Sequence, residues 1–116
     1  MLPKKYRLKS KLAFSATYRV NNSRKCNGIV VIAGLKKKND IETKVGFVVS
    51  KKTHKRAVKR NRLRRLMREA YRLLLKDGDL GASQEYMSLI FLGTERALEL
   101  DFNKVKKTVK FLLMEL

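Results

Sequence analysis

Eleven cations lie between residues 51 and 72, and their type and spacing suit the binding of a polyanion. Glu69 is the only acid of this segment, so its formal charge is 11 − 1 = +10. After Lys59 the cations are all arginine, whose planar guanidinium makes paired hydrogen bonds to phosphate. A packed segment of this charge repels itself unless a polyanion neutralises it, and we expect that polyanion to be nucleic acid.

Within this segment, one amide and the crowding of cations at a predicted helix start are informative. Asn61 interrupts the cations. Its side chain could hydrogen-bond a base or a ribose 2′-hydroxyl, or could order the helix start, and the sequence leaves both open. Lys55, Arg56 and Lys59 oppose the helix macrodipole, which favours anions at this end. A phosphate backbone would resolve that conflict, because it meets both the cations and the free N–H groups.

No catalytic constellation accompanies these cations. His54 is the only histidine, and no carboxylate adjacent in sequence would orient it as a base. Asp77 and Asp79 flank Gly78, which indicates a turn rather than a metal site. Cys26 is the only cysteine, which excludes an intrachain disulfide and suits a reducing cytoplasm. We therefore predict no catalytic residue, no metal ligand and no firmly bound cofactor.

Composition places these residues in one strongly basic domain. The chain has 116 residues and a formal net charge of +19. Residues 1–72 carry 23 Lys or Arg and 3 acids, hence +20, whereas residues 73–116 carry 6 and 7, hence −1. Solubility alone needs a net charge of roughly 2–8 in a small domain. We predict a single nucleic-acid-binding domain over 1–116 that is cytoplasmic, because no apolar run approaches a membrane span.

Three helices are expected from periodicity and capping signals. The first covers 10–20 with Ser10 as its cap, and the last covers 100–116 with Asp101 as its cap. The basic segment forms the middle helix over 56–76, because its apolar residues fall in one stripe at about 100° per residue. In that helix the core side is Leu63, Leu66, Met67, Ala70 and Leu74, and the opposite stripe is Asn61, Arg65, Arg68 and Arg72, flanked by Arg62 and Arg64.

Three strands are expected between these helices. β-branched and alternating runs predict them over 28–34, 43–50 and 85–92. Because the loop 36–40 is short, the first two should pair as an antiparallel hairpin. The order α-β-β-α-β-α, with room for one extra short strand, predicts a single-domain α+β sandwich with helices on a small, mainly antiparallel sheet.

Two aromatic residues of the first helix have two open interpretations. Phe14 and Tyr18 are four apart on one helix face, which composition alone favours as core. Alternatively they line a groove with the sheet and stack on single-stranded bases. Gly46 lacks a side chain, so a strand of nucleic acid could approach closely there. The sheet side of such a groove would be Lys44, Gly46, Val48 and Ser50.

The end of the second predicted strand and the start of the basic helix together form a specific pattern. The chain reads Val45-Gly46-Phe47-Val48-Val49-Ser50-Lys51-Lys52, then Ala57-Val58, then Arg60-Asn61-Arg62-Leu63-Arg64-Arg65-Leu66-Met67-Arg68-Glu69. This pattern, with Arg7-Leu8 and the aromatics Phe14 and Tyr18 upstream, resembles the protein component of bacterial ribonuclease P. The resemblance covers roughly residues 5–75, and the later part agrees in element order only.

The resemblance implies a partner and a division of roles. In that family a large catalytic RNA, with Mg²⁺, removes the 5′ leader of precursor tRNA by hydrolysing one phosphodiester, and the protein assists. We therefore expect one protein per RNA, a protein that is inactive alone, and Mg²⁺ required by the complex. The family also implies a left-handed β-α-β crossover through the basic helix, which periodicity does not indicate because the usual hand is right.

The resemblance and the cationic segment together give the expected site residues. The RNA-contacting residues are expected to be Lys51, Lys52, Arg56, Lys59, Arg60, Asn61, Arg62, Arg64, Arg65, Arg68 and Arg72. The groove for the 5′ leader is expected to be lined by Phe14, Tyr18, Lys44, Gly46, Val48 and Ser50, with the two aromatics shared between core and groove wall.

Other classes of protein share some of these features. A basic ribosomal-type RNA-binding protein would share the charge and size but would not need an open aromatic groove. In a helix-turn-helix protein the basic helix would follow a short helix rather than a strand. An amphipathic helix on an anionic membrane could carry the same arginines, but such helices are not usually embedded in a sheet.

Overall fold

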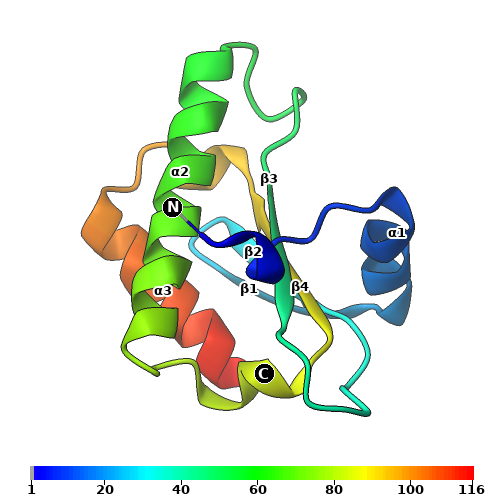
Figure 1. The fold of residues 1–116 in the computed structure, drawn as a ribbon. Helices are drawn as coiled ribbons and strands as arrows, with labels where there is room; N and C mark the ends of the chain where they lie inside the picture. The colour runs from blue at the N-terminus through cyan, green and yellow to red at the C-terminus, as the bar shows by residue number, and fades with distance from the viewer. Residues whose placement is uncertain (1) are drawn as a thin grey trace.

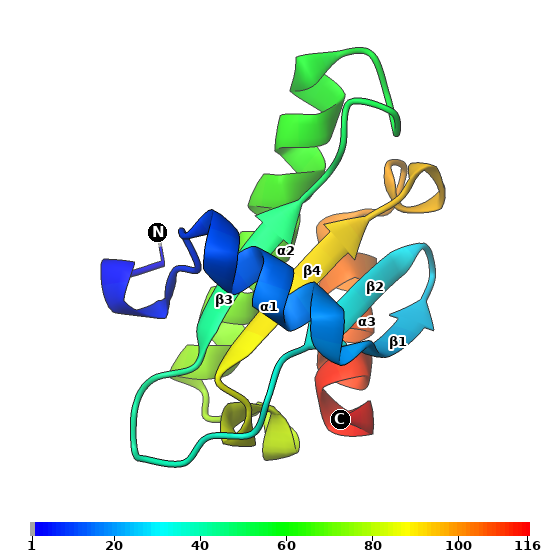
Figure 2. The same cartoon turned by 90° about the vertical axis from the view of Figure 1, so that its right-hand side faces the viewer.

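The fold is a four-stranded sheet with helices on both faces. The computed structural model describes residues 2–116. Its elements are α1 (Lys11–Val20), β1 (Asn22–Cys26), β2 (Ile29–Ala33), β3 (Lys44–Val48), α2 (Ala57–Lys76), β4 (Ser88–Gly93) and α3 (Phe102–Glu115), with short 3₁₀ helices at Lys4–Tyr6, Gly81–Glu85 and Glu95–Ala97. Figures 1 and 2 show α1 on one face of the sheet and α2 with α3 on the other.

The three predicted helices are confirmed, with ends within two residues of the expected ones. Asn21 ends α1 in the left-handed conformation, with φ of 59°. The predicted cap of α3 is confirmed, because Asp101 Oδ1 accepts a hydrogen bond from the backbone N–H of Lys104 at 2.8 Å. Ser10 occupies the N-cap position of α1, as predicted, but its side chain makes no capping hydrogen bond.

The predicted hairpin between 28–34 and 43–50 is wrong. The strand order is β1-β2-β4-β3, in which β2 pairs antiparallel with β1 and β4, and β3 pairs parallel with β4. The extra short strand is β1, joined to β2 by Asn27 and Gly28, whose φ values are 50° and 82°. Positive φ at both central residues is typical of a tight type I′ hairpin turn. The sheet is therefore mainly antiparallel, with one parallel pair.

The connection from β3 through α2 to β4 is left-handed, as the family resemblance implies. Figure 2 shows both strand arrows pointing up, β4 to the right of β3, and α2 behind the sheet. Seen from the helix side, the chain moves to the left, opposite to the usual hand. Residues 49–56 join the carboxyl end of β3 to the start of α2, so the cations of residues 51–56 lie between these two elements.

The main core lies between the sheet and the helices α2 and α3. Phe47 of β3, Tyr71 of α2 and Phe91 of β4 form an aromatic cluster with ring centroids 5.7–6.2 Å apart. The predicted core side of α2 is confirmed except at Leu66, which is only half-buried. Tyr71 is fully buried although the stripe did not include it. A smaller apolar cluster under α1, on the other sheet face, contains Leu8, Ile32 and Ile90.

Stability above pH 10 is expected to depend on the hydroxyl of Tyr71. This hydroxyl accepts a hydrogen bond from Gln84 Nε2 at 3.1 Å, and burial raises the pKa of Tyr71 from 10.0 to about 12. The unfolded chain ionises the group first, so its contribution is intact below about pH 10 and the free energy of unfolding falls as pH rises toward about 12. Denaturant unfolding across that range should show a smaller fall in Tyr71→Phe. Equal falls in both proteins would contradict the prediction.

Candidate RNA-binding interface

One side of α2 and the segment leading into it present cations to solvent. This side is opposite the buried residues Leu63 and Met67, as the periodicity predicts. No acidic residue lies in the first turn of α2, and its cap position makes no side-chain hydrogen bond to the free N–H groups there. The exposed ones among the predicted RNA-contacting residues, which we call the cationic face, are Lys51, Lys52, Arg56, Asn61, Arg65 and Arg68, and Lys55 is exposed beside them.

Two of the predicted RNA-contacting arginines are engaged within the protein. The guanidinium of Arg62 donates hydrogen bonds to the backbone oxygens of Leu98 and Leu100, at 3.1 and 3.2 Å. Arg72 donates two hydrogen bonds to Glu69, at 2.6 and 3.1 Å, and these lower the pKa of that carboxyl. Arg62 therefore holds the segment before α3 against α2. Contacts of these two arginines with RNA stay a prediction.

The side chain of Asn61 forms a hydrogen bond within its own helix. Its amide oxygen accepts a hydrogen bond from the Arg64 guanidinium one turn later, which favours the local of its two interpretations. Lys59 Nζ lies 3.8 Å from the carboxylate of Glu99 in an exposed ion pair, and such pairs contribute little to stability. Arg60 is half-buried. The residues most open to a partner are therefore those of the cationic face.

The aromatic residues of α1 lie over the sheet face opposite α2. The ring of Phe14 packs on Gly46, where an added Cβ would lie 2.5 Å from Phe14 Cζ. Gly46 thus admits a ring of the protein itself, and the expectation that it leaves room for nucleic acid is wrong. Phe14 is half-buried, and Tyr18 is 42% exposed with its pKa raised by partial burial. Both rings support packing and keep surface open to a ligand.

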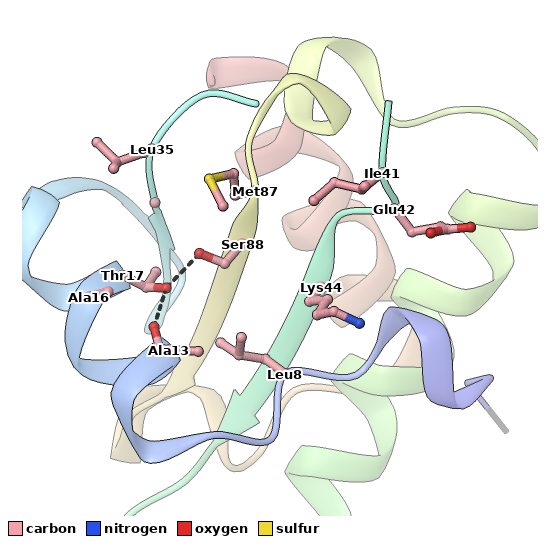
Figure 3. Close-up of a pocket in the computed structure, with 11 residues that line it drawn as sticks. Leu8, Ala13, Ala16, Thr17, Leu35, Ile41, Glu42, Lys44, Met87 and Ser88 are labelled. Carbon is pink, nitrogen blue, oxygen red and sulfur yellow. Dashed lines mark hydrogen bonds between the residues drawn. The ribbon is translucent and has the colours of Figure 1, made fainter. Parts of the chain in front are cut away.

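The helix α1 divides the predicted groove residues into two sets. Val48 and Phe14 pack against the same small apolar cluster, and Ser50 is exposed two residues beyond Val48. Tyr18 shares the face of Phe14 because the two are one helical turn apart. Lys44 instead lines a cavity at the opposite flank of α1 (Figure 3). The structure therefore brings Phe14 and Val48 to one apolar cluster, keeps Tyr18 on the helix face of Phe14, and separates Lys44 from them.

The side chain of His54 forms a hydrogen bond within the turn that precedes α2. Its Nδ1 accepts a hydrogen bond from the backbone N–H of Arg56 at 3.0 Å. Among residues 2–116, no three His, Cys, Asp or Glu side chains gather where they could hold a metal ion. None of the described helices is both long and apolar enough to cross a bilayer.

The fold and the cationic face define a class, a basic α+β domain with a left-handed β-α-β crossover. The family model for Ribonuclease P matches residues 2–116. The ribonuclease P protein component of Symbiobacterium thermophilum is 36% identical over 109 residues, which cover 94% of this chain and 89% of that protein. That of Synechococcus sp. (strain JA-2-3B'a(2-13)) is 37% identical over 105 residues, with 86% and 77% covered. The chain belongs to the family of ribonuclease P protein components.

Solved structures share the same fold. The RNase P protein of Staphylococcus aureus superimposes with a TM-score of 0.75 at 23% identity, covering 95% of this chain and 94% of that one. The RNase P protein of Thermotoga maritima, in complex with 1-(4-fluorophenyl)-2-thiourea, gives 0.77 at 24% identity, with 95% and 99% covered. These identities are low, so the likeness bears on the fold.

Proposed function

We propose that this chain is the protein subunit of ribonuclease P and acts in tRNA processing as part of an endoribonuclease complex. Family membership across residues 2–116 carries the proposal. The exposed cationic face on α2 supports it, since arginines at helix spacing with no acid in the first turn suit an RNA backbone. The partner of this face is the RNA of ribonuclease P.

The two surfaces of the protein bind two different RNAs. The cationic face neutralises phosphates of the ribonuclease P RNA and releases their counterions, and the free N–H groups at the start of α2 are open to a phosphate. On the other side of the sheet, Phe14 and Tyr18 stack on the single-stranded 5′ leader of precursor tRNA, and Val48 packs against the same apolar cluster as Phe14. The protein thus links the catalytic RNA to its substrate.

Catalysis belongs to the RNA in this proposal. The RNA, with Mg²⁺, hydrolyses the phosphodiester at the end of the leader, and one protein joins one RNA in the cytoplasm. The chain's single histidine supports this division, because His54 Nδ1 is committed to the backbone N–H of Arg56. For a histidine to act as a general base, one ring nitrogen must face the substrate while another group orients the ring through the other nitrogen.

The purified protein is expected to cleave nothing alone and to activate a ribonuclease P RNA at low Mg²⁺. Its cationic face would supply part of the screening that the RNA otherwise takes from Mg²⁺. Precursor-tRNA cleavage by RNA alone, protein alone and both together, over a Mg²⁺ series, measures this. A basic ribosomal protein of similar charge is the matched control. Equal activation by that control, or cleavage by RNA-free protein that survives repurification, would refute the proposal.

A further inference from the structure

Residues 2–10, which we call the N-terminal segment, are anchored at the outer edge of β3. Figure 2 shows this segment beside β3, where Arg7 pairs with Val45 and the backbone N–H of Leu8 donates to the Val45 oxygen at 3.0 Å. Leu2 and Leu8 are 1% and 8% exposed, so both leucines pack into the domain. The position of the segment is therefore fixed, and binding a partner there costs little conformational entropy.

The N-terminal segment is basic, and acidic residues are scarce around it. No acid precedes Asp40 in the sequence. Lys5 lies 3.9 Å from the carboxylate of Glu42 in an exposed ion pair, and such pairs are weak. Lys4 and Lys9 are exposed, and neither forms an ion pair with an acid of residues 2–116. Their charges are therefore available to an anionic partner.

Two hollows border the N-terminal segment, and among the described residues every charged side chain that lines them is a cation. The first hollow has a volume of about 190 Å³, and its charged lining is Arg7, Lys9 and Arg68. The second has a volume of about 370 Å³, and its charged lining is Lys4, Arg7, Lys9 and Lys44. Arg7 and Lys9 line both hollows, so the cations form one continuous surface.

Hydrogen bonds to the backbone hold two of these cations in place. Arg7 Nε donates to the backbone oxygen of Leu2 at 2.7 Å, and Lys44 Nζ donates to that of Lys5 at 3.1 Å. Each acceptor is a neutral carbonyl, so both cations keep their charge uncompensated. The guanidinium of Arg7 also keeps its other N–H groups, which suit paired hydrogen bonds to a phosphate.

The first hollow connects the two RNA-binding surfaces of the proposed function. Arg68 of the cationic face lines it from α2, and Phe14 of the leader groove lines it from α1. An RNA strand that reaches from one surface to the other at the edge of β3 therefore meets cations throughout. An acidic peptide would match this charge, but RNA matches the charge and also continues onto both neighbouring surfaces.

We propose that the N-terminal segment is a further RNA-binding surface, where Lys4, Arg7 and Lys9 contact the phosphates of an RNA strand that crosses the edge of β3. The proposal rests on the proposed function and extends the RNA contacts to cations outside α2. A phosphodiester backbone is the chemistry that this surface recognises. The strand can belong to the ribonuclease P RNA or to the 5′ leader of precursor tRNA, and the experiments below separate these two sources.

Replacing Lys4 and Lys9 together by alanine tests the charge of this surface. The slope of log K against log salt for RNA binding should fall by about 1.4–1.8, because each lost phosphate contact contributes roughly 0.7–0.9. Lys25→Ala with Lys104→Ala is the matched control, since both lysines are exposed and neither pairs with an acid of residues 2–116. Equal reductions in the two double variants would overturn the proposal, because total charge rather than position would then explain them. Melting temperatures establish that both variants fold.

Two RNA ligands identify the source of the phosphates. A reduced slope with the ribonuclease P RNA alone assigns the phosphates to that RNA. A reduction seen only when holoenzyme, assembled at saturating protein, binds leader-bearing rather than leaderless tRNA assigns them to the leader. A slope equal to that of the wild type with every ligand refutes this proposal and leaves the proposed function standing. If the wild-type protein fails to bind the RNA, the proposed function fails as well.

Crosslinking from residue 9 tests its proximity to RNA independently of affinity. Cys26 is the only cysteine, so Cys26→Ser combined with Lys9→Cys gives one attachment site for a photoactivatable reagent. In the same background, Arg65→Cys is the positive control on the cationic face and Lys104→Cys is the negative control on α3. We expect RNA crosslinks from residues 9 and 65 and none from residue 104.

Three results of the crosslinking experiment would contradict the proposal. The first is a crosslink from residue 65 without one from residue 9, which would leave the proposed function intact. The second is equal crosslinking from residues 9 and 104, which would mean that RNA meets any basic surface of the protein. The third is a crosslink from residue 9 to an oligo-glutamate peptide in preference to RNA, which would assign the surface to an acidic protein.

Discussion

Replacing Arg65 and Arg68 together by alanine is expected to weaken binding to the ribonuclease P RNA and to leave the domain folded. Both side chains are exposed on α2, and within residues 2–116 neither is paired with an acid. Each lost phosphate contact should reduce the slope of log K against log salt by roughly 0.7–0.9. Filter binding at several salt concentrations, with thermal unfolding of the same proteins, measures both quantities.

Arg62→Ala is the matched control for that double variant. It removes an arginine of the same helix whose guanidinium donates to the backbone oxygens of Leu98 and Leu100. This change should lower the free energy of unfolding by about 1–3 kcal/mol, because two carbonyl groups lose a charged donor. If the double variant melts at a lower temperature and keeps its salt slope, Arg65 and Arg68 support the packing of α2 and do not contact the RNA.

Tyr18→Ala is expected to weaken binding of precursor tRNA to the holoenzyme and to leave binding of leaderless tRNA unchanged. Tyr18 is 42% exposed and lies one helical turn after Phe14 on the same side of α1. A base stacked on an aromatic ring is worth about 1–3 kcal/mol by alanine substitution, so the affinity for the leader-bearing substrate should fall about 5- to 150-fold. Titrations with a five-nucleotide leader and with no leader compare the two.

Phe14→Leu complements the tyrosine variant with less loss of packing. Phe14 rests on Gly46, so a full truncation would also open a hole over β3. The leucine variant should show the same selective loss for the leader-bearing substrate. Equal losses on both substrates would mean that the aromatics serve the core or a general RNA surface, and the leader groove would have to be abandoned.

The helices were predictable from the sequence, and the pairing of the strands was not. Helix 57–76 follows from an apolar stripe and an Asp-Gly stop that are both local. The strand Asn22–Cys26 has no apolar alternation, because it lies at the sheet edge with three exposed residues in its middle. The Asn27-Gly28 pair is the typical signal of a two-residue hairpin and was the available clue. Because this clue was missed, residues 28–34 were paired with 43–50, whereas β2 pairs with β1 and β4.

The cationic face was predictable from the same periodicity as the helix. The residues that depart from the prediction depend on contacts with residues distant in the sequence. Arg62 could not be separated from the exposed arginines, since its acceptors lie 36 and 38 residues further along the chain. The position of Lys44 on the other flank of α1 depends on how that helix crosses the sheet. Gly46 was read as an opening, whereas the ring that fills it comes from Phe14 of a distant element.

The parallel pairing of β3 with β4 also sets the earliest point in synthesis at which the sheet that covers α2 can form. β4 is the only named strand that pairs with β3, and it ends at residue 93, which is 45 residues after β3. At roughly 5–20 residues per second, translation takes about 2–9 s to make that stretch. Nascent chains arrested before and after residue 93 should therefore differ in the protease resistance of residues 57–76. Until β4 emerges from the ribosome, the apolar side of α2 lacks a strand that covers it. The cations of α2 can therefore bind ribosomal RNA before they meet the RNA of ribonuclease P.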